Sequence, residues 1–199
     1  MNRIEYWKQF IKSSDIDNLA KDLNNSWNPN TKTYDSYTPL KIELLNEIKE
    51  PLKDLTVLDF GCGLGRNTKN LSSIFKKVIS YDLPEMVDKF KELHGNKYEI
   101  YDKWNDILQI NIDIIFDCTV FQHLDIELLD TYLNTTNARY IYCHTRCYND
   151  TGRNFQSYSG GINLFKHIVN NERYKSYKLF QNINPLAMDE THYDILYIR

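Results

Sequence analysis

A glycine-rich stretch in the first half of the chain constrains the fold most. The segment VLDFGCGLGRNT, residues 57–68, holds three of the seven glycines in the chain: Gly61, Gly63 and Gly65. It follows a β-prone run over 56–60 and precedes a helical pattern over 67–75. Glycines there permit positive φ and close approach of a ligand, and the helix start offers free amides. The pattern predicts a nucleotide-type cradle, with an ordinary glycine-rich turn as the alternative.

Strand and helix patterns alternate through the middle of the chain. Further strands are expected over 77–81, 98–101, 113–118 and 139–144, and helices over 39–50, 85–93, 125–133 and 164–169. Near the end, 174–180 and 193–198 look like two strands with no helix between them, so they should pair antiparallel. The sequence therefore predicts an α/β fold whose sheet is mostly parallel.

Composition excludes several classes of protein. With 199 residues, 42% of them hydrophobic, the chain can bury a core, which excludes a disordered polymer. The net charge of −3 gives no field that attracts a polyanion. The first residues carry no long apolar run, so we expect neither export nor a membrane span. Four sparse cysteines, Cys62, Cys118, Cys143 and Cys147, favour reduced thiols and a cytoplasmic protein.

The glycine spacing distinguishes between nucleotide ligands. A dinucleotide fingerprint would place a third glycine where this chain has Arg66, which disfavours an NAD-dependent dehydrogenase. Asp82 ends the second strand, 21 residues after Gly61, where a carboxylate can accept both ribose hydroxyls. VLDFGCGLGRNT followed by ISYDLPEM resembles motif I and the acidic second motif of class I S-adenosylmethionine-dependent methyltransferases. DIIFDCTVFQHLD, residues 113–125, is similar to the fourth-strand segment of that family.

The resemblance implies a fold, a domain arrangement and a cofactor. The fold would be a three-layer α/β/α Rossmann-like sandwich with a seven-stranded, mostly parallel sheet and an antiparallel C-terminal strand pair. Residues 39–199 would form one methyltransferase domain, and residues 1–38, which match no motif, would form a helical cap or lid. The cofactor would be S-adenosylmethionine, with S-adenosylhomocysteine as the product.

The resemblance also implies roles for individual residues. The glycine-rich loop would contact the methionine part and the ribose edge of the cofactor through Gly61, Cys62, Gly63 and Gly65. Asp59 would help to hold the methionine ammonium, and Asp82 would bind the ribose hydroxyls. Thr119 and Val120 would line the methionine end. The adenine would lie beside Leu83, with Asn105 or Asp106 at its exocyclic amine and Trp104 as a stacking candidate.

Methyl transfer from a sulfonium needs alignment more than covalent chemistry. A general base would help a hydroxyl acceptor, and His123 and His144 are the candidates, each with a structural role as the alternative. The acceptor pocket would involve Arg146 and Tyr158, and Tyr34 and Tyr37 from the N-terminal segment. We expect no metal: Cys143 and His144 should point to opposite sides of a strand, so Cys143-His144-x-x-Cys147 makes a poor zinc site.

The acceptor class follows from what the sequence lacks. Amino methylation of nucleic acid bases usually shows an Asn/Asp-Pro-Pro-aromatic run after the fourth strand, where this chain reads Asp117-Cys118-Thr119-Val120. Since no basic stripe appears either, we do not expect nucleic acid as a partner. The sequence therefore favours methyl transfer to an O or N atom of a small molecule, a sugar or other metabolite. The alternatives are a protein or RNA methyltransferase that works with a partner, and a noncatalytic subunit that binds the cofactor.

Overall fold

The structure is a computed structural model that describes residues 3–23, 27–34, 40–148, 172–174, 176–183 and 190–199. The chain divides into two compact units, and each is described by itself. The first unit combines residues 1–38 with 52–110, and the second combines 39–51 with 111–199. Tyr37, Tyr158 and the helix expected over 164–169 lie outside the described residues.

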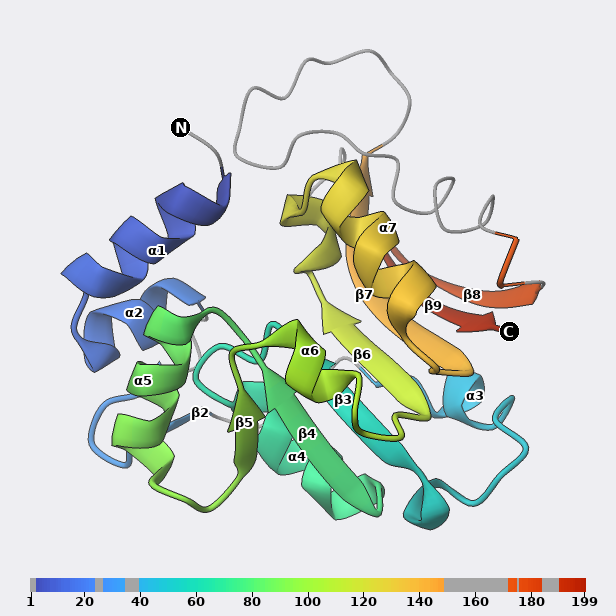
Figure 1. The fold of residues 1–199 in the computed structure, drawn as a ribbon, viewed down its shortest axis with the longest axis horizontal. Helices are drawn as coiled ribbons and strands as arrows, with labels where there is room; N and C mark the ends of the chain where they lie inside the picture. Colours follow the sequence, from blue (N-terminus) through green and yellow to red (C-terminus); the bar gives the residue numbers. More distant parts are fainter. Residues whose placement is uncertain (1–2, 24–26, 35–39, 149–171, 175, 184–189) are drawn as a thin grey trace. The chain divides into compact units, whose positions relative to one another are not determined.

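The first unit is built on three parallel strands (Figure 1). β3 (Thr56–Phe60) pairs with β4 (Lys77–Tyr81), which pairs with β5 (Glu99–Tyr101). The crossovers are α4 (Arg66–Ile74) and α5 (Pro84–His94), and α6 (Trp104–Ile107) follows β5. Pro84 opens α5, where its missing N–H costs nothing, and Gly95 caps it with positive φ, as the sequence predicted. β3 and β4 match the predicted ranges.

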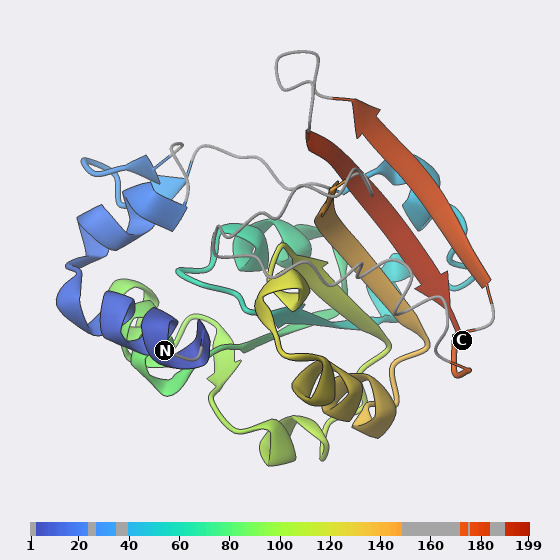
Figure 2. The same cartoon turned by 90° about the horizontal axis from the view of Figure 1, so that it is seen from above.

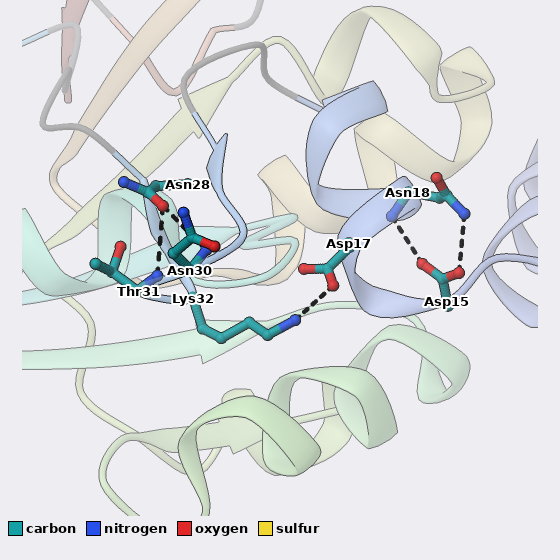
Figure 3. Close-up of polar contacts among 7 residues, drawn as sticks. All are labelled: Asp15, Asp17, Asn18, Asn28, Asn30, Thr31 and Lys32. Atoms are coloured by element: carbon teal, nitrogen blue, oxygen red, sulfur yellow. Dashed lines mark hydrogen bonds and ion pairs between the residues drawn. The ribbon is translucent and has the colours of Figure 1, made fainter.

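The N-terminal segment of the first unit is a helix pair followed by a hairpin. α1 (Arg3–Ser13) and α2 (Ile16–Leu23) precede β1 (Trp27–Asn28), which pairs antiparallel with β2 (Thr33–Tyr34). Asp15 caps α2, since its carboxylate accepts from the backbone N–H of Asn18 at 2.8 Å (Figure 3). Asp17 on α2 pairs with Lys32 at the hairpin turn, which ties hairpin and helix together (Figure 3).

A hydrophobic cluster joins this segment to the glycine-rich region. Ile11, Leu19 and Ala20 from α1 and α2 are buried against Leu64 and Met86. Leu64 belongs to the loop between β3 and α4, and Met86 to the first turn of α5. The N-terminal helices therefore share a core with the loop predicted to bind the cofactor.

The second unit carries the remaining strands in the order β6-β7-β9-β8. β6 (Ile114–Cys118) runs parallel to β7 (Tyr140–Tyr148), and β9 (Glu190–Ile198) pairs antiparallel with both β7 and β8 (Ser176–Ile183). Figure 2 shows β9 between β7 and β8. Its helical elements are α3 (Ile42–Leu45), the short 3-10 helix η2 (Phe121–His123) and α7 (Ile126–Thr135). The predicted antiparallel C-terminal pair is confirmed.

The seven strands form one mixed, mostly parallel sheet in the order β5-β4-β3-β6-β7-β9-β8, and with the helices between the strands this is the Rossmann-like α/β fold predicted from the sequence. No helix within the described ranges is long and apolar enough to cross a membrane.

Several predicted elements differ in extent. β8 ends at Ile183 where the sequence predicted 180, and β9 begins at Glu190 where it predicted 193. Two further differences have a local cause. The helix expected over 39–50 is reduced to α3. After its first turn the hydrogen bonds span three residues instead of four, since the Glu47 N–H donates to the Leu44 carbonyl and the Ile48 N–H to the Leu45 carbonyl. Pro51 also disfavours a helical conformation at Glu50. The fifth predicted strand continues four residues beyond 144, since its pairing with β9 extends to Tyr148 opposite Glu190.

Candidate functional site

The loop after β3 is a tight, backbone-determined turn. Gly61, Gly63 and Gly65 have φ of 65°, 55° and 80°, in the left-handed region that disfavours residues with a Cβ. The Gly61 N–H donates to the carbonyl of Tyr81 at 2.8 Å, which ties the loop to the end of β4. Gly65 then caps α4, and a Cβ on it would lie 2.8 Å from the ring of Phe90. Close packing and conformation together require glycine there.

Asp82 holds two backbone amides at the end of β4. Its Oδ2 accepts from the Gly63 N–H at 2.7 Å, and its Oδ1 accepts from the Leu83 N–H at 2.7 Å. Burial raises the pKa of Asp82 to about 6, although the two amide bonds act in the opposite direction. The carboxylate is therefore ionised at pH 7, and each oxygen keeps a second lone pair with which it can accept a hydroxyl.

A buried polar network lies below the loop, and sequence reasoning missed most of it. The Thr68 hydroxyl on α4 donates to Asp59 Oδ2 on β3 at 2.6 Å and lies 3.2 Å from the Ser80 hydroxyl on β4. All three side chains are at most 1% exposed. Cys62 adjoins this network, and burial together with the charges of Asp82 and Asp59 raises the pKa of its thiol well above the usual value. The network holds Asp59 in place, while its predicted ammonium contact stays a prediction.

His94 makes a further contact with the glycine-rich loop, which the sequence analysis did not predict. Its Nε2 lies 2.9 Å from the carbonyl oxygen of Leu64, and its ring packs 4.7 Å from that of Phe90. Burial lowers the pKa of His94, so it is neutral at pH 7. The end of α5 therefore helps to fix the glycine loop.

The residues predicted to surround adenine lie in the same unit as the loop. The Trp104 ring meets those of Tyr81 at 5.5 Å and Phe60 at 6.0 Å, both edge to face. Since Phe60 and Tyr81 end β3 and β4, Trp104 lies at the carboxyl edge of the strands that carry the loop and Asp82. Asn105 and Asp106 are exposed on α6, and Leu83 packs against the N-terminal cluster. Their roles toward adenine stay predictions.

In the second unit, the chain makes a strained turn at the carboxyl end of β6. Thr119 has φ of 66°, which is a genuine outlier for a β-branched residue. Its N–H donates to the carbonyl of His144 at 2.8 Å. Oδ1 of Asp117, a fully buried residue, accepts from the amides of Val120 and Phe121, at 3.0 and 2.9 Å. Such strain persists where the surroundings enforce it, and it clusters at functional sites.

The two candidate bases have different surroundings. His123 ends η2 at intermediate burial, with Nε2 3.3 Å from the side-chain amide nitrogen of Gln122. His144 lies on β7 opposite Cys118, and its Nδ1 is 2.7 Å from Oδ1 of the fully buried Asp194. Sequence reasoning missed Asp194, although one carboxylate inside the apolar run of 193–198 was a detectable signal.

The predicted acceptor residues are only partly covered by the structure. Tyr34 lies on β2 and Arg146 on β7, but their side chains fall outside the described part, as do Tyr37 and Tyr158. Among the residues that the structure describes, no group of three or more His, Cys, Asp or Glu is placed to hold a metal ion. The thiol of Cys143 instead donates to Asp117 Oδ2 at 2.9 Å.

The first unit fits an adenosyl ligand with an amino acid tail. Asp82 offers oriented acceptors to a ribose diol, and the positive-φ glycines leave room beside the backbone. Asn67, in the first turn of α4, is 5% exposed, and its Oδ1 has no hydrogen-bond partner among the residues that the structure describes. A buried acceptor of this kind costs free energy unless another group satisfies it. A hydrogen-bond donor on a ligand could satisfy this oxygen.

Comparison with known proteins gives the same class of fold. No family model matches the chain. A curated relative, phosphoethanolamine N-methyltransferase 3 of Arabidopsis thaliana, is 26% identical over 172 residues, which cover 77% of this chain and 32% of the relative. The bifunctional kinase-methyltransferase WbdD matches with a TM-score of 0.58 and 15% identity, over 92% of this chain and 46% of that one. The chain thus spans less than half of both proteins.

A third likeness covers most of both chains. Magnesium protoporphyrin IX methyltransferase (ChlM) from Synechocystis PCC 6803, crystallised with S-adenosylmethionine, matches with a TM-score of 0.51 and 16% identity, over 79% of this chain and 76% of that one. At this identity the solved structures establish the fold. The chain has the fold of the class I S-adenosylmethionine-dependent methyltransferases, as the motifs in its sequence predicted.

Proposed function

We propose that this protein is an S-adenosylmethionine-dependent methyltransferase that acts on an O or N atom of a small molecule. The observation that carries the proposal is the Asp82 carboxylate, which both amide contacts orient beside three positive-φ glycines. In an open α/β sheet, ligands bind outside the carboxyl ends of the strands, and the loop and Asp82 are at such an end. The curated relative, which is itself named a methyltransferase, supports the reaction class.

The residues would divide the work between binding and proton transfer. S-Adenosylmethionine supplies an electrophilic methyl group on a sulfonium. Asp82 would hold the ribose, the loop from Gly61 to Gly65 the methionine part, and Trp104 the adenine. Thr119 and Val120 would line the methionine end. His144 or His123 would take the proton of the acceptor, a contribution of about 10²–10⁴ in rate.

A small acceptor fits the charge of the chain better than a polyanion. The net charge is −3, and electrostatic attraction dominates most nucleic acid binding. The names of two similar proteins point the same way, since phosphoethanolamine and magnesium protoporphyrin IX are both small molecules. A protein or RNA acceptor with a partner for specificity is the second candidate.

A ligand titration tests the cofactor. We expect S-adenosylmethionine or S-adenosylhomocysteine at 100 times its Kd to add about 2.7 kcal/mol, or roughly 5–10 °C in Tm. NAD should give no shift. Asp82→Asn keeps the size of the side chain but removes its charge, so it should abolish the shift. Asp88→Asn, an exposed carboxylate on α5, is the matched control and should leave the shift unchanged. A shift with NAD alone would contradict the proposal.

An acceptor screen tests turnover. Purified protein is incubated with S-adenosylmethionine and pools of alcohols, phenols, amines and sugars, and formation of S-adenosylhomocysteine is measured. A pool that raises its formation supports a small-molecule acceptor. Turnover only with protein or RNA fractions would favour the second candidate. Binding without turnover on any fraction would identify a noncatalytic cofactor-binding subunit.

A further inference from the structure

A carboxylate and an imidazole face each other in the second unit. His144 on β7 and Asp194 on β9 are direct partners in the antiparallel register, so their side chains share one face of the sheet. Nδ1 of His144 lies 2.7 Å from Oδ1 of Asp194. Asp194 is 0% exposed, whereas the His144 side chain keeps 10% of its surface exposed. The buried member of the pair is therefore the carboxylate, and the imidazole retains some contact with solvent.

The same sheet face carries another buried polar side chain, which takes no part in the His144–Asp194 hydrogen bond. Tyr142, two residues before His144, stacks on Phe116 at 5.6 Å, and its hydroxyl accepts from the Lys41 N–H at 2.8 Å. The backbone carbonyl of His144 itself accepts from the Thr119 N–H at 2.8 Å. The turn after β6 thus fixes the backbone of His144, and the Asp194 carboxylate fixes the orientation of its ring.

The hydrogen bond determines the tautomer of the ring. An ionised carboxylate only accepts, so the Nδ1 of His144 must carry the proton. The neutral imidazole then has its lone pair on Nε2, which is the arrangement that a general base needs. A neutral histidine in water prefers the proton on Nε2, so a hydrogen bond from Nδ1 to a carboxylate selects the less common form. A buried carboxylate also needs hydrogen-bond donors, and the Nδ1–H of the imidazole is one.

We propose that Asp194 is a positioning residue that keeps His144 as a base at Nε2, a role that rests on the proposed methyltransferase function. During transfer, the acceptor atom forms a bond to the methyl carbon while the methyl–sulfur bond breaks, and the proton of the acceptor moves to Nε2. The resulting imidazolium donates from Nδ1 to the Asp194 carboxylate, so the charge that forms in the step meets an opposite charge. The pair therefore favours His144 over His123 as the base and favours an acceptor that loses a proton, such as a hydroxyl.

Nitrogen-15 NMR of the histidine rings tests this proposal without an acceptor. Protein labelled at its histidines is examined at a pH where the rings are neutral, and His144→Gln assigns the His144 signals. In the wild type we expect the proton on Nδ1. In Asp194→Asn, whose amide can also donate, we expect the proton to be shared with or moved to Nε2. Tyr142→Phe is the matched control, because it removes another buried polar group from the same face and should leave the tautomer unchanged.

Steady-state kinetics with an acceptor from the screen complete the test. Asp194→Asn should lower kcat by about 10²–10⁴ with little change in KM, and Asp194→Glu should restore part of it. Tyr142→Phe should keep kcat. The proposal is overturned if the wild-type proton lies on Nε2, if Asp194→Asn leaves the tautomer unchanged, or if kcat survives in Asp194→Asn. Failure of the proposed function would appear separately, as absent cofactor binding with an intact Nδ1–H tautomer.

Discussion

At the residue scale, Gly65 combines two constraints that can be separated by mutation. A Cβ there would lie 2.8 Å from Cε2 of Phe90 and 3.0 Å from Nε2 of His94, at φ of 80°. We expect Gly65→Ala to lower the free energy of unfolding by about 2–4 kcal/mol, from backbone strain and overpacking together. Urea denaturation followed by circular dichroism measures the loss.

Gly95 provides the control for that substitution. It also has positive φ, 58°, but a Cβ there would meet nothing within 4 Å. Gly95→Ala should therefore cost backbone strain without overpacking, about 1–3 kcal/mol at its ψ of −131°. A Gly65→Ala loss that stays within about 1 kcal/mol, the strain of a non-glycine residue in the left-handed region alone, would mean that the packing of Phe90 and His94 on the loop contributes little.

Sequence reasoning predicted candidate residues that depend on local pattern and missed contacts that depend on pairing. The glycines and Asp82 follow from a strand, a loop and a spacing, and the structure brings Asp82 to the loop through the Gly63 amide. Thr68 and Ser80 could not be identified in this way, because their bonds join a helix to two strands. Asp194 is 50 residues from His144 in the sequence, so only the register of β7 and β9 pairs them.

At the element scale, the turn after β6 should make stability depend on pH. Burial raises the pKa of Asp117 to about 6, against 3.8 for an ordinary carboxyl group, despite bonds from Cys143 and two amides. The folded state thus holds the proton more tightly than the unfolded state, and stability falls as pH rises from about 4 to 6. Two pKa units correspond to about 3 kcal/mol. Urea midpoints across pH 4–7 measure this fall.

Asp117→Asn tests the origin of that pH dependence. The amide oxygen can still accept from Val120 and Phe121, but the side chain no longer titrates. The fall in stability between pH 4 and 6 should become smaller, and the part that remains includes the contribution of Asp82, whose pKa is also raised to about 6. Asp88→Asn, on the surface of α5, should keep the wild-type slope. An unchanged slope in Asp117→Asn would show that other groups dominate.

The boundaries of elements were predictable where a local signal ends them. Pro84 and Gly95 bound α5 as expected, because each acts through its own backbone. The predicted helix over 39–50 was too long, because mainly apolar spacing supported it. That spacing also suits a short helix and a turn that bury Leu44, Leu45 and Ile48. The length of β7 could not be predicted either, since its last residues are set by pairing with β9.

At the scale of the molecule, the N-terminal helices are part of a core. The sequence predicts residues 1–38 as a cap or lid, and the structure groups them with 52–110. Leu19 is 0% exposed in the cluster that contains Leu64 of the glycine loop. We expect Leu19→Ala to lower the free energy of unfolding by about 2–4 kcal/mol. Chemical denaturation measures this, with the exposed Ile42→Ala as a control that should change little.

Cofactor affinity in the same variant separates two roles of the helices. If α1 and α2 support the loop, Leu19→Ala should also weaken S-adenosylhomocysteine binding, measured by calorimetry below the unfolding transition. If Leu19→Ala kept the wild-type free energy of unfolding, α1 and α2 would contribute nothing to the stability of this core. The sequence could not predict this packing, because the motif of the loop extends no further toward the N-terminus than residue 57.

The two amide bonds of Asp82 have a consequence for the kinetics of ligand capture. Because the carboxylate accepts from the amides of Gly63 and Leu83, folding itself orders the loop and the acidic residue relative to each other. Little conformational entropy then remains to be lost when a nucleoside arrives. Association should be a single fast phase with a rate constant of about 10⁵–10⁷ M⁻¹s⁻¹. Differences in affinity should then come mainly from the dissociation rate constant.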